Sequence, residues 1–220
     1  MFITLEGIDG CGKSTQARLL AAALEHAGRD VLLLREPGGV AISEKIRVLL
    51  LDPENGAMCD ACELLLYEAA RAQLVHEVIR PALAQNRVVV CDRFYDSTTA
   101  YQAFAGGSTR EDADRANALA VGDCRPDVTF VFDIDPEKAA VRREGRNDAP
   151  DRMEEKGLEF QQCVAEGFRT IAREEPQRVR TIDASQPVDA VFACMLAELA
   201  HAGLAVDAAD ARAALLQPEA

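Results

Sequence analysis

The sequence contains no run of about 18 apolar residues, the length at which a stretch becomes a candidate membrane-spanning helix. The pattern of Phe2–Glu6 predicts a buried strand, and we find no charged region or cleavage site of the kind that marks a targeting signal. We therefore expect a soluble, cytoplasmic protein without membrane association. The formal net charge of −13 opposes nonspecific attraction to nucleic acids. Any site for a polyanionic ligand must then be built locally from a few converging arginines.

Metal-binding and nucleophilic clusters are also scarce. The seven cysteines, an odd number, indicate reduced thiols rather than a disulfide framework. Cys59 and Cys62 form the only pair with ligand spacing, and neither a second pair nor a nearby histidine completes a zinc site. Metal or redox use of this pair remains the less favoured alternative. The three histidines are scattered at helical positions and are expected to serve surface or packing roles: His26, His76 and His201.

The clearest motif present is Gly7–Thr15, which matches G-x-x-x-x-G-K-[ST] between an apolar strand pattern and a helix pattern over 13–27. Its glycines allow backbone N–H groups to approach phosphate oxygens. Lys13 adds a charge near the outer phosphates, and Ser14 adds a hydroxyl for Mg²⁺. Kinases, ATPases and GTPases all use this motif. The predicted nucleotide-binding residues here are Gly7, Ile8, Asp9, Gly10, Cys11, Gly12, Lys13, Ser14 and Thr15.

Strand and helix patterns alternate along the rest of the chain. Further buried strands are predicted over 31–34, 87–93, 128–133 and 179–183. Helices are predicted over 43–51, about 61–83, 109–122, from 136, 154–175 and 188–199. This order is typical of an α/β fold with a parallel sheet. No repeat or linker divides the chain, so we expect one domain over residues 1–205 and a frayed tail over 206–220.

Two loops that follow predicted strands carry charges. Asp92 ends the third strand, where a carboxylate can share with Ser14 the binding of Mg²⁺. ATP-driven motors commonly place a second acid next, but here Arg93 follows, which favours binding of a second phosphate and hence phosphoryl transfer. The other loop, 35–39, is a candidate ligand crevice. A plain turn with solvated charges explains that loop equally well.

The predicted helix over 61–83 carries two further candidates. Leu65, Ala69 and Leu74 are assigned to its apolar side. Tyr67 and Arg71 are four residues apart, so an aromatic ring and a guanidinium on one face could hold a flat, polar-edged ligand. The residues alone favour a simpler interpretation, a partly buried tyrosine beside a surface arginine.

The segment Asp92–Gln102 resembles the D-R-[FY]-x-x-S-x-x-A-Y-Q signature of thymidylate kinases of the bacterial type. Glu6–Gly10, Arg35–Gly39 and Ile182–Gln186 resemble other motifs of this family, in its order and at about its spacing. The resemblance extends from residue 2 to about 200. It implies a P-loop nucleoside-monophosphate-kinase-like fold, with a five-stranded parallel sheet flanked by helices. It also implies phosphorylation of dTMP to dTDP by ATP and Mg²⁺ in dTTP synthesis, by a homodimer joined through the long helices.

The arginine-rich stretch 142–152 resembles the LID loop of nucleoside monophosphate kinases. The variable positions of the phosphate loop lack the arginine that some family members carry there, so the resemblance implies that the LID supplies it. A solvated cluster of charges is the alternative. The residues to which the resemblance gives catalytic roles are Lys13, Asp9, Arg93, Arg142, Arg146 and Arg152.

The resemblance also assigns roles in binding. The adenine would lie near Arg142, Ser185 and Gln186. The sugar hydroxyl or the metal would meet Asp9, and Tyr101 would exclude a ribose 2′-hydroxyl. The family usually has phenylalanine where this chain has Tyr67, which adds a hydroxyl to the base pocket. The acceptor-binding residues implied are Asp9, Glu36, Pro37, Arg47, Tyr67, Arg71, Arg93, Ser97, Thr98, Tyr101 and Gln102.

Two other functions are considered. Another small-molecule P-loop kinase would share the phosphate loop, but the signature around Arg93 argues against it. A GTPase-like switch would require an N-K-x-D guanine motif after a late strand. Neither 128–135 nor 179–186 contains one.

Overall fold

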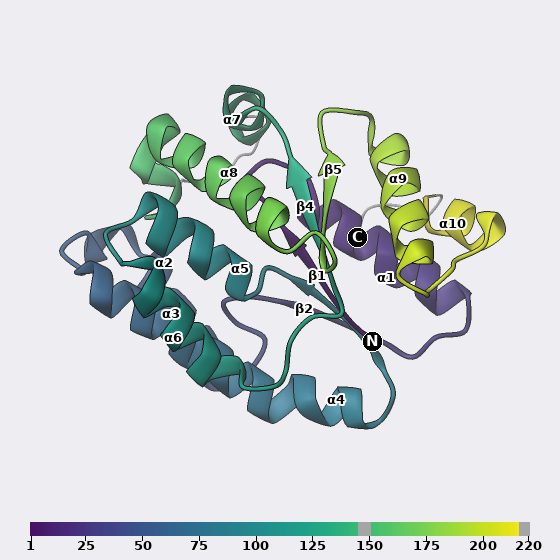
Figure 1. Cartoon of the computed structure of the whole chain (residues 1–220), viewed down its shortest axis with the longest axis horizontal. Helices are drawn as coiled ribbons and strands as arrows, with labels where there is room; N and C mark the ends of the chain where they lie inside the picture. Colours follow the sequence, from purple (N-terminus) through teal and green to yellow (C-terminus); the bar gives the residue numbers. More distant parts are fainter. Residues whose placement is uncertain (145–150, 216–220) are drawn as a thin grey trace.

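The computed structural model describes residues 1–144 and 151–215. At its centre is a parallel five-stranded sheet with the strand order β2-β3-β1-β4-β5 (Figure 1). The strands are β1 (Phe2–Glu6), β2 (Val31–Arg35), β3 (Val88–Asp92), β4 (Val128–Asp133) and β5 (Val179–Asp183). The predicted fold class is confirmed, and the strands lie within a residue or two of their predicted bounds.

Helices cover both faces of the sheet, which is why β1 and β4 are buried on both faces (Figure 1). One face carries α1 (Lys13–His26), α9 (Val188–His201) and α10 (Ala208–Leu215). The other side carries α3 (Asp60–Leu74), α6 (Arg110–Val121) and α8 (Gly157–Glu174). The remaining helical segments are α2 (Ala41–Leu51), a 3₁₀ turn (Pro53–Asn55), α4 (Arg80–Ala84), α5 (Tyr95–Thr98), α7 (Pro136–Glu144) and a 3₁₀ turn (Glu154–Lys156). Within the described residues, no helix has the length and apolarity needed to cross a bilayer.

The helix predicted over 61–83 has two features that the pattern did not show. A π-helical segment, Val75–Ile79, joins α3 to α4, and a second one, Thr99–Ala105, continues α5. Leu65 is 64% exposed although it was assigned to the buried side, whereas Leu74 is fully buried. These two leucines are about 2.5 turns apart at 3.6 residues per turn, so they lie on opposite sides of the helix.

The C-terminal segment differs from the expectation of a frayed tail over 206–220. Residues Ala208–Leu215 form α10, which packs against α1. Leu204 and Ala214 are buried in the main hydrophobic core, so an apolar face in this alanine-rich stretch anchors it. Residues 216–220 lie outside the described part of the chain.

Candidate active site

The phosphate loop has the strand–loop–helix geometry that its motif requires. It connects β1 to α1, and Gly12 precedes the helix with a φ of 95°, a left-handed conformation that glycine adopts without strain. A Cβ atom on Gly7 would lie 2.9 Å from the carbonyl oxygen of Phe132, so this close approach also requires glycine. The Lys13 ammonium lies along the loop, where it donates to Ile8 O at 3.4 Å and to Asp9 Oδ1 at 3.5 Å. The unpaired N–H groups at the start of α1 therefore open onto a positively charged cradle.

The carboxylate predicted for metal binding lies beside this loop. β3 pairs with β1 so that Asp92 is opposite Leu5, near the end of the strand that leads into the loop. Ser14 Oγ donates a hydrogen bond to Asp92 Oδ2. Asp92 Oδ1 is buried and has no hydrogen-bond partner within residues 1–144 and 151–215. A hydroxyl and a carboxylate with one unpartnered oxygen are oxygen ligands of the kind that a hard divalent cation prefers.

Arg93 connects the phosphate loop to the neighbouring pocket. Its φ of 72° turns the chain immediately after β3. Its guanidinium donates to Gly7 O at 3.1 Å, Ser97 Oγ at 3.0 Å, Asp9 Oδ1 at 2.6 Å and Tyr101 Oη at 3.1 Å. Burial raises the pKa of Asp9, but Arg93 and Lys13 outweigh this effect and hold it well below its usual range. The cluster keeps the Asp9 carboxylate ionised beside Arg93 at one edge of the pocket.

All the acceptor-binding residues implied by the family resemblance line one cavity of about 560 Å³, a volume that includes its opening to solvent. The structure therefore brings together positions that lie between 9 and 102 in the chain, although their individual roles remain predictions. The sequence reasoning missed three further residues that line the cavity: Leu51, Asp151 and Met153. Leu51 and Met153 belong to no motif, and Asp151 lies in the arginine-rich stretch 142–152 but carried no predicted role in acceptor binding.

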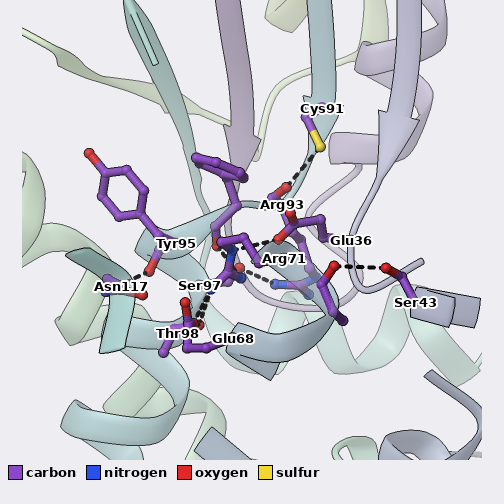
Figure 2. A network of polar contacts seen from close by, with 12 residues as sticks. Glu36, Ser43, Glu68, Arg71, Cys91, Arg93, Tyr95, Ser97, Thr98 and Asn117 are labelled. Atoms are coloured by element: carbon purple, nitrogen blue, oxygen red, sulfur yellow. Dashed lines mark hydrogen bonds and ion pairs between the residues drawn. The ribbon is translucent and has the colours of Figure 1, made fainter. Parts of the chain in front are cut away.

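Arg71 lies at the base of this cavity, and only 2% of it is exposed, so the interpretation as a surface arginine was wrong. Figure 2 shows it between Glu36 and Glu68. Its Nε donates to Glu36 Oε2 at 2.7 Å, Nη1 donates to Glu68 Oε1 and to Thr98 Oγ1 at 2.8 Å, and Nη2 donates to Phe94 O at 3.2 Å. A guanidinium has five N–H donors, and among the described residues these bonds occupy four, which leaves one Nη2–H for a ligand.

The two carboxylates beside Arg71 fix its charge and position. Burial raises the pKa of Glu36 to about 7, although Arg71 pulls it downward. Burial lowers the pKa of Arg71, but Glu36 and Glu68 raise it by more, so the guanidinium stays charged. Sequence reasoning missed Glu68, whose only signal was its position three residues before Arg71 on α3.

The arginines of the predicted LID lie in different places. Arg142 Nη1 donates to Ala184 O at 3.0 Å, next to the predicted adenine residue Ser185. Arg143 packs against the phosphate loop, where a Cβ atom on Gly10 would lie 3.0 Å from its Cγ. Arg152 is instead buried against α3, with Nη1 donating to Glu63 Oε2 at 2.5 Å. Arg146 lies outside the described residues.

The loop after β5 holds the other residues predicted to bind adenine. Asp183 accepts hydrogen bonds from Ser185 N at 2.9 Å, Ser185 Oγ at 2.6 Å and Gln186 Nε2 at 2.9 Å. These bonds lower the pKa of Asp183 to about 2. Ser185 and Gln186 are both exposed, so this part of the site is open to solvent.

A phosphate loop after β1, an acid at the end of β3 and an arginine-lined second pocket define a P-loop kinase with the nucleoside monophosphate kinase fold. The family model described as Thymidylate kinase matches residues 5–194. The chain therefore belongs to the thymidylate kinase family.

Individual relatives agree with this placement. The chain is 46% identical over 195 residues to the thymidylate kinase of Syntrophotalea carbinolica, covering 86% of this chain and 90% of the relative. It is 47% identical over 191 residues to that of Symbiobacterium thermophilum, covering 87% and 88%. The crystal structure of thymidylate kinase from Ehrlichia chaffeensis superposes with a TM-score of 0.74 at 35% identity, covering 90% of this chain and 98% of that structure.

Proposed function

We propose that this protein transfers the γ-phosphoryl group of ATP to dTMP, giving dTDP and ADP for dTTP synthesis. Membership of the thymidylate kinase family supports this activity. The observation that carries the proposal is Arg71, which the fold holds in the second pocket with one N–H unused. That donor suits a carbonyl oxygen, which thymine presents at O4, whereas cytosine presents an amino group there.

Phosphoryl transfer requires positioning and charge neutralisation more than covalent chemistry. Lys13 and the loop amides would hold the β- and γ-phosphates of the donor. Arg93 and Arg47 would hold the acceptor phosphate in line with the donor, Arg93 being directly beside Asp9. Arg47 lies at the same pocket and donates to Pro37 O at 3.0 Å. These residues bring two anions together and offset their mutual repulsion.

The donor set around Asp92 supports Mg²⁺ as the metal. Ser14 and Asp92 would hold it, and Asp92 Oδ1, which has no other partner among the described residues, would coordinate it directly or through water. When bound, the ion neutralises charge on the phosphate oxygens. The chain's own contribution is to keep the hydroxyl and the carboxylate in contact at the start of α1.

The sugar contacts would come from a rigid tyrosine. Tyr101 Oη lies 3.1 Å from Arg93 Nη2 and 3.2 Å from Asp9 Oδ2, so its ring is fixed at the pocket wall. We propose that this ring occupies the space that a ribose 2′-hydroxyl would need, while Asp9 meets the 3′-hydroxyl.

We further propose that the protein is a cytoplasmic homodimer that does not bind nucleic acid. The helices α2, α3 and α6 pack together, and they expose large apolar side chains. These are Ile42, Val48, Leu49, Leu65 and Leu119. Exposed apolar groups on neighbouring helices suit a second copy of the chain. Sedimentation velocity at micromolar concentration should give twice the monomer mass of 23.8 kDa, and a species of the monomer mass would contradict the dimer.

The activity is tested by measuring ADP release from ATP with a panel of nucleoside monophosphates. We expect dTMP to be the best acceptor. The methyl group is worth about 1–3 kcal/mol, so dUMP should be roughly 10- to 200-fold worse in kcat/KM. Cytosine and purine monophosphates should be worse still, because they leave buried polar groups unpaired. A panel in which CMP, AMP or GMP outperforms dTMP would refute the acceptor assignment.

A further inference from the structure

A single buried carboxylate connects the base pocket to the end of the arginine-rich stretch and to the 3₁₀ turn that follows it. Glu63 lies on α3 and is 3% exposed. Its Oε1 accepts a hydrogen bond from Gln102 Nε2 at 3.0 Å, and its Oε2 accepts one from Arg152 Nη1 at 2.5 Å. Lys156 Nζ lies 3.2 Å from both oxygens. Neither the phosphate loop nor the acceptor pocket includes Glu63 itself.

The contact with Glu63 determines which way the Gln102 side-chain amide points. An ionised carboxylate accepts hydrogen bonds and cannot donate them, so the NH₂ end of the amide must face Glu63. Burial raises the pKa of Glu63, but Gln102, Lys156 and Arg152 lower it by more, and the carboxyl stays ionised. Within the described residues no donor is hydrogen-bonded to Gln102 Oε1, and Gln102 lines the acceptor cavity. The amide therefore offers the pocket an acceptor.

We propose that Glu63 is a positioning residue for base selection, which fixes the Gln102 amide so that its carbonyl oxygen faces the base. This inference rests on the proposed function and adds a second determinant to it. Arg71 offers a donor and Gln102 an acceptor, the pair that matches O4 and N3–H of thymine. Cytosine has an amino group and an unprotonated N3 at the same two places, so it is mismatched at both.

The other partners of Glu63 keep this orientation in place. Arg152 Nε donates to Leu50 O at 2.7 Å, and Arg152 N donates to Leu51 O at 3.1 Å. These bonds tie residue 152 to the end of α2, on the wall of the same cavity. Arg152 and Lys156 thus hold the Glu63 carboxylate in place. Without that carboxylate, the Gln102 amide would be free to rotate by half a turn.

A purely structural role for Glu63 predicts a different result. If Glu63 only anchors Arg152 and Lys156, its replacement should lower kcat/KM for every acceptor alike. The selectivity, defined as kcat/KM for dTMP divided by kcat/KM for dCMP, would then be unchanged. Selectivity therefore separates positioning of the amide from anchoring of the chain.

The decisive variant is Glu63→Gln, assayed with dTMP and dCMP at saturating ATP. We expect selectivity to fall by roughly 10- to 100-fold, mainly through a higher KM for dTMP, because a neutral amide no longer dictates the orientation of Gln102. If Glu63→Gln does not fold, as judged by its thermal transition, Glu63→Asp retains the carboxylate at a shorter reach and should give a smaller fall. Selectivity within about threefold of the original protein in the folded variant would overturn the proposal.

Four further variants complete the experiment. Gln102→Ala should lower selectivity as much as Glu63→Gln, and the double variant should be no worse than Gln102→Ala, because both changes remove the same contact. Lys156→Ala removes a partner of Glu63 but leaves the acceptor for Gln102, so it should retain selectivity. Glu111→Gln, which breaks the exposed pair with Arg115, is the matched surface control. If the unaltered protein does not prefer dTMP to dCMP, the proposed function fails independently of Glu63.

Discussion

The donor and acceptor sides of the site are built in different ways. Around the phosphate loop, the polar groups are backbone amides, short side chains and the cationic Lys13 and Arg143. Ser14, Ser185 and Gln186 on this side are exposed. In the acceptor pocket, Arg71 and Glu36 are buried and already bonded to each other. The donor side recognises a group common to all nucleoside triphosphates, whereas the acceptor side must distinguish one base. Changes on the donor side should therefore affect rate, and changes on the acceptor side should affect stability and selectivity.

The largest effect is expected on the donor side, from Lys13→Ala. Because Lys13 supplies the main charge of the loop to the outer phosphates, kcat should fall by roughly 10³-fold or more. The thermal transition should move little, since within the part of the chain that the structure describes its ammonium forms two long hydrogen bonds, at 3.4 and 3.5 Å. Lys45→Ala, at an exposed position on α2, is the control. A kcat for Lys13→Ala near that of the control would disprove the assignment of this loop as the site that holds the donor phosphates.

The arginines of 142–152 provide the next test of the donor side. Arg143 lies against the phosphate loop, so Arg143→Ala should lower kcat by roughly 10³-fold with a much smaller change in the KM for ATP. Arg142→Ala should act mainly on ATP binding, and Arg152→Ala on stability. If single alanine variants at these positions and at Arg146 all retain kcat within about tenfold, the stretch is only a charged surface.

On the acceptor side, Arg71→Ala should reduce both stability and selectivity. It leaves Glu36 and Glu68 buried without their cation, which should cost about 3–5 kcal/mol of unfolding free energy. The ratio of kcat/KM for dTMP to that for dCMP should fall. Arg93→Ala should instead lower kcat/KM for every acceptor alike. Arg35→Ala breaks an exposed pair with Glu44 and should cost less than about 1 kcal/mol. Equal stability losses for Arg71→Ala and Arg35→Ala in urea unfolding would contradict the structural role given to the buried ion pairs of the acceptor pocket.

The smallest effect concerns Glu6, which accepts hydrogen bonds from Phe94 N at 2.7 Å and Ser97 Oγ at 2.5 Å. Burial and Asp96 raise its pKa to about 8, although Ser97 and Arg93 oppose the shift. The folded protein therefore binds an extra proton between pH 4.5 and about 8, and stability should fall as pH rises through this window. In Glu6→Gln, the loss of unfolding free energy across this pH window should be smaller by about 1 kcal/mol or more. Parallel pH profiles of urea unfolding for the two proteins would contradict this.

The fold was predictable because its signals are local. Each strand is a short apolar run, and the phosphate loop places its chemistry on consecutive residues. The wrong predictions concern segments whose structure or burial depends on packing against distant parts of the chain. The alanine-rich C-terminal segment has weak periodicity, and its burial depends on a complementary face of α1. Leu65 was misassigned because a helix over 61–83 contains enough apolar residues to suggest more than one face.

The site was predictable only in part, because some of its residues are brought together by long-range contacts that no local pattern shows. Motifs and family resemblance identified residues that line the acceptor cavity, including Glu36 and Gln102. They did not identify Glu63 and Glu68, which act through other side chains. Nor did they show that Arg152 pairs with Glu63, because the two are separated by 89 positions and no spacing rule joins them. Residues that touch a ligand can be found through motifs, whereas residues that hold those residues emerge only from the fold.

The immobility of Arg71 has a consequence for inhibitors. Folding has already fixed its rotamer, so a ligand does not bear the ordering cost of roughly 0.5–1.5 kcal/mol for a flexible side chain. The pocket should thus bind rigid, flat molecules that present one carbonyl and one N–H, even when they carry no phosphate. It should adapt poorly to any other pattern, since a rearrangement would have to break several buried ion pairs and hydrogen bonds at once. Around Arg71, the pocket therefore selects the base by shape and hydrogen-bond pattern, whereas Arg47 and Arg93 would recognise the charge of the phosphate.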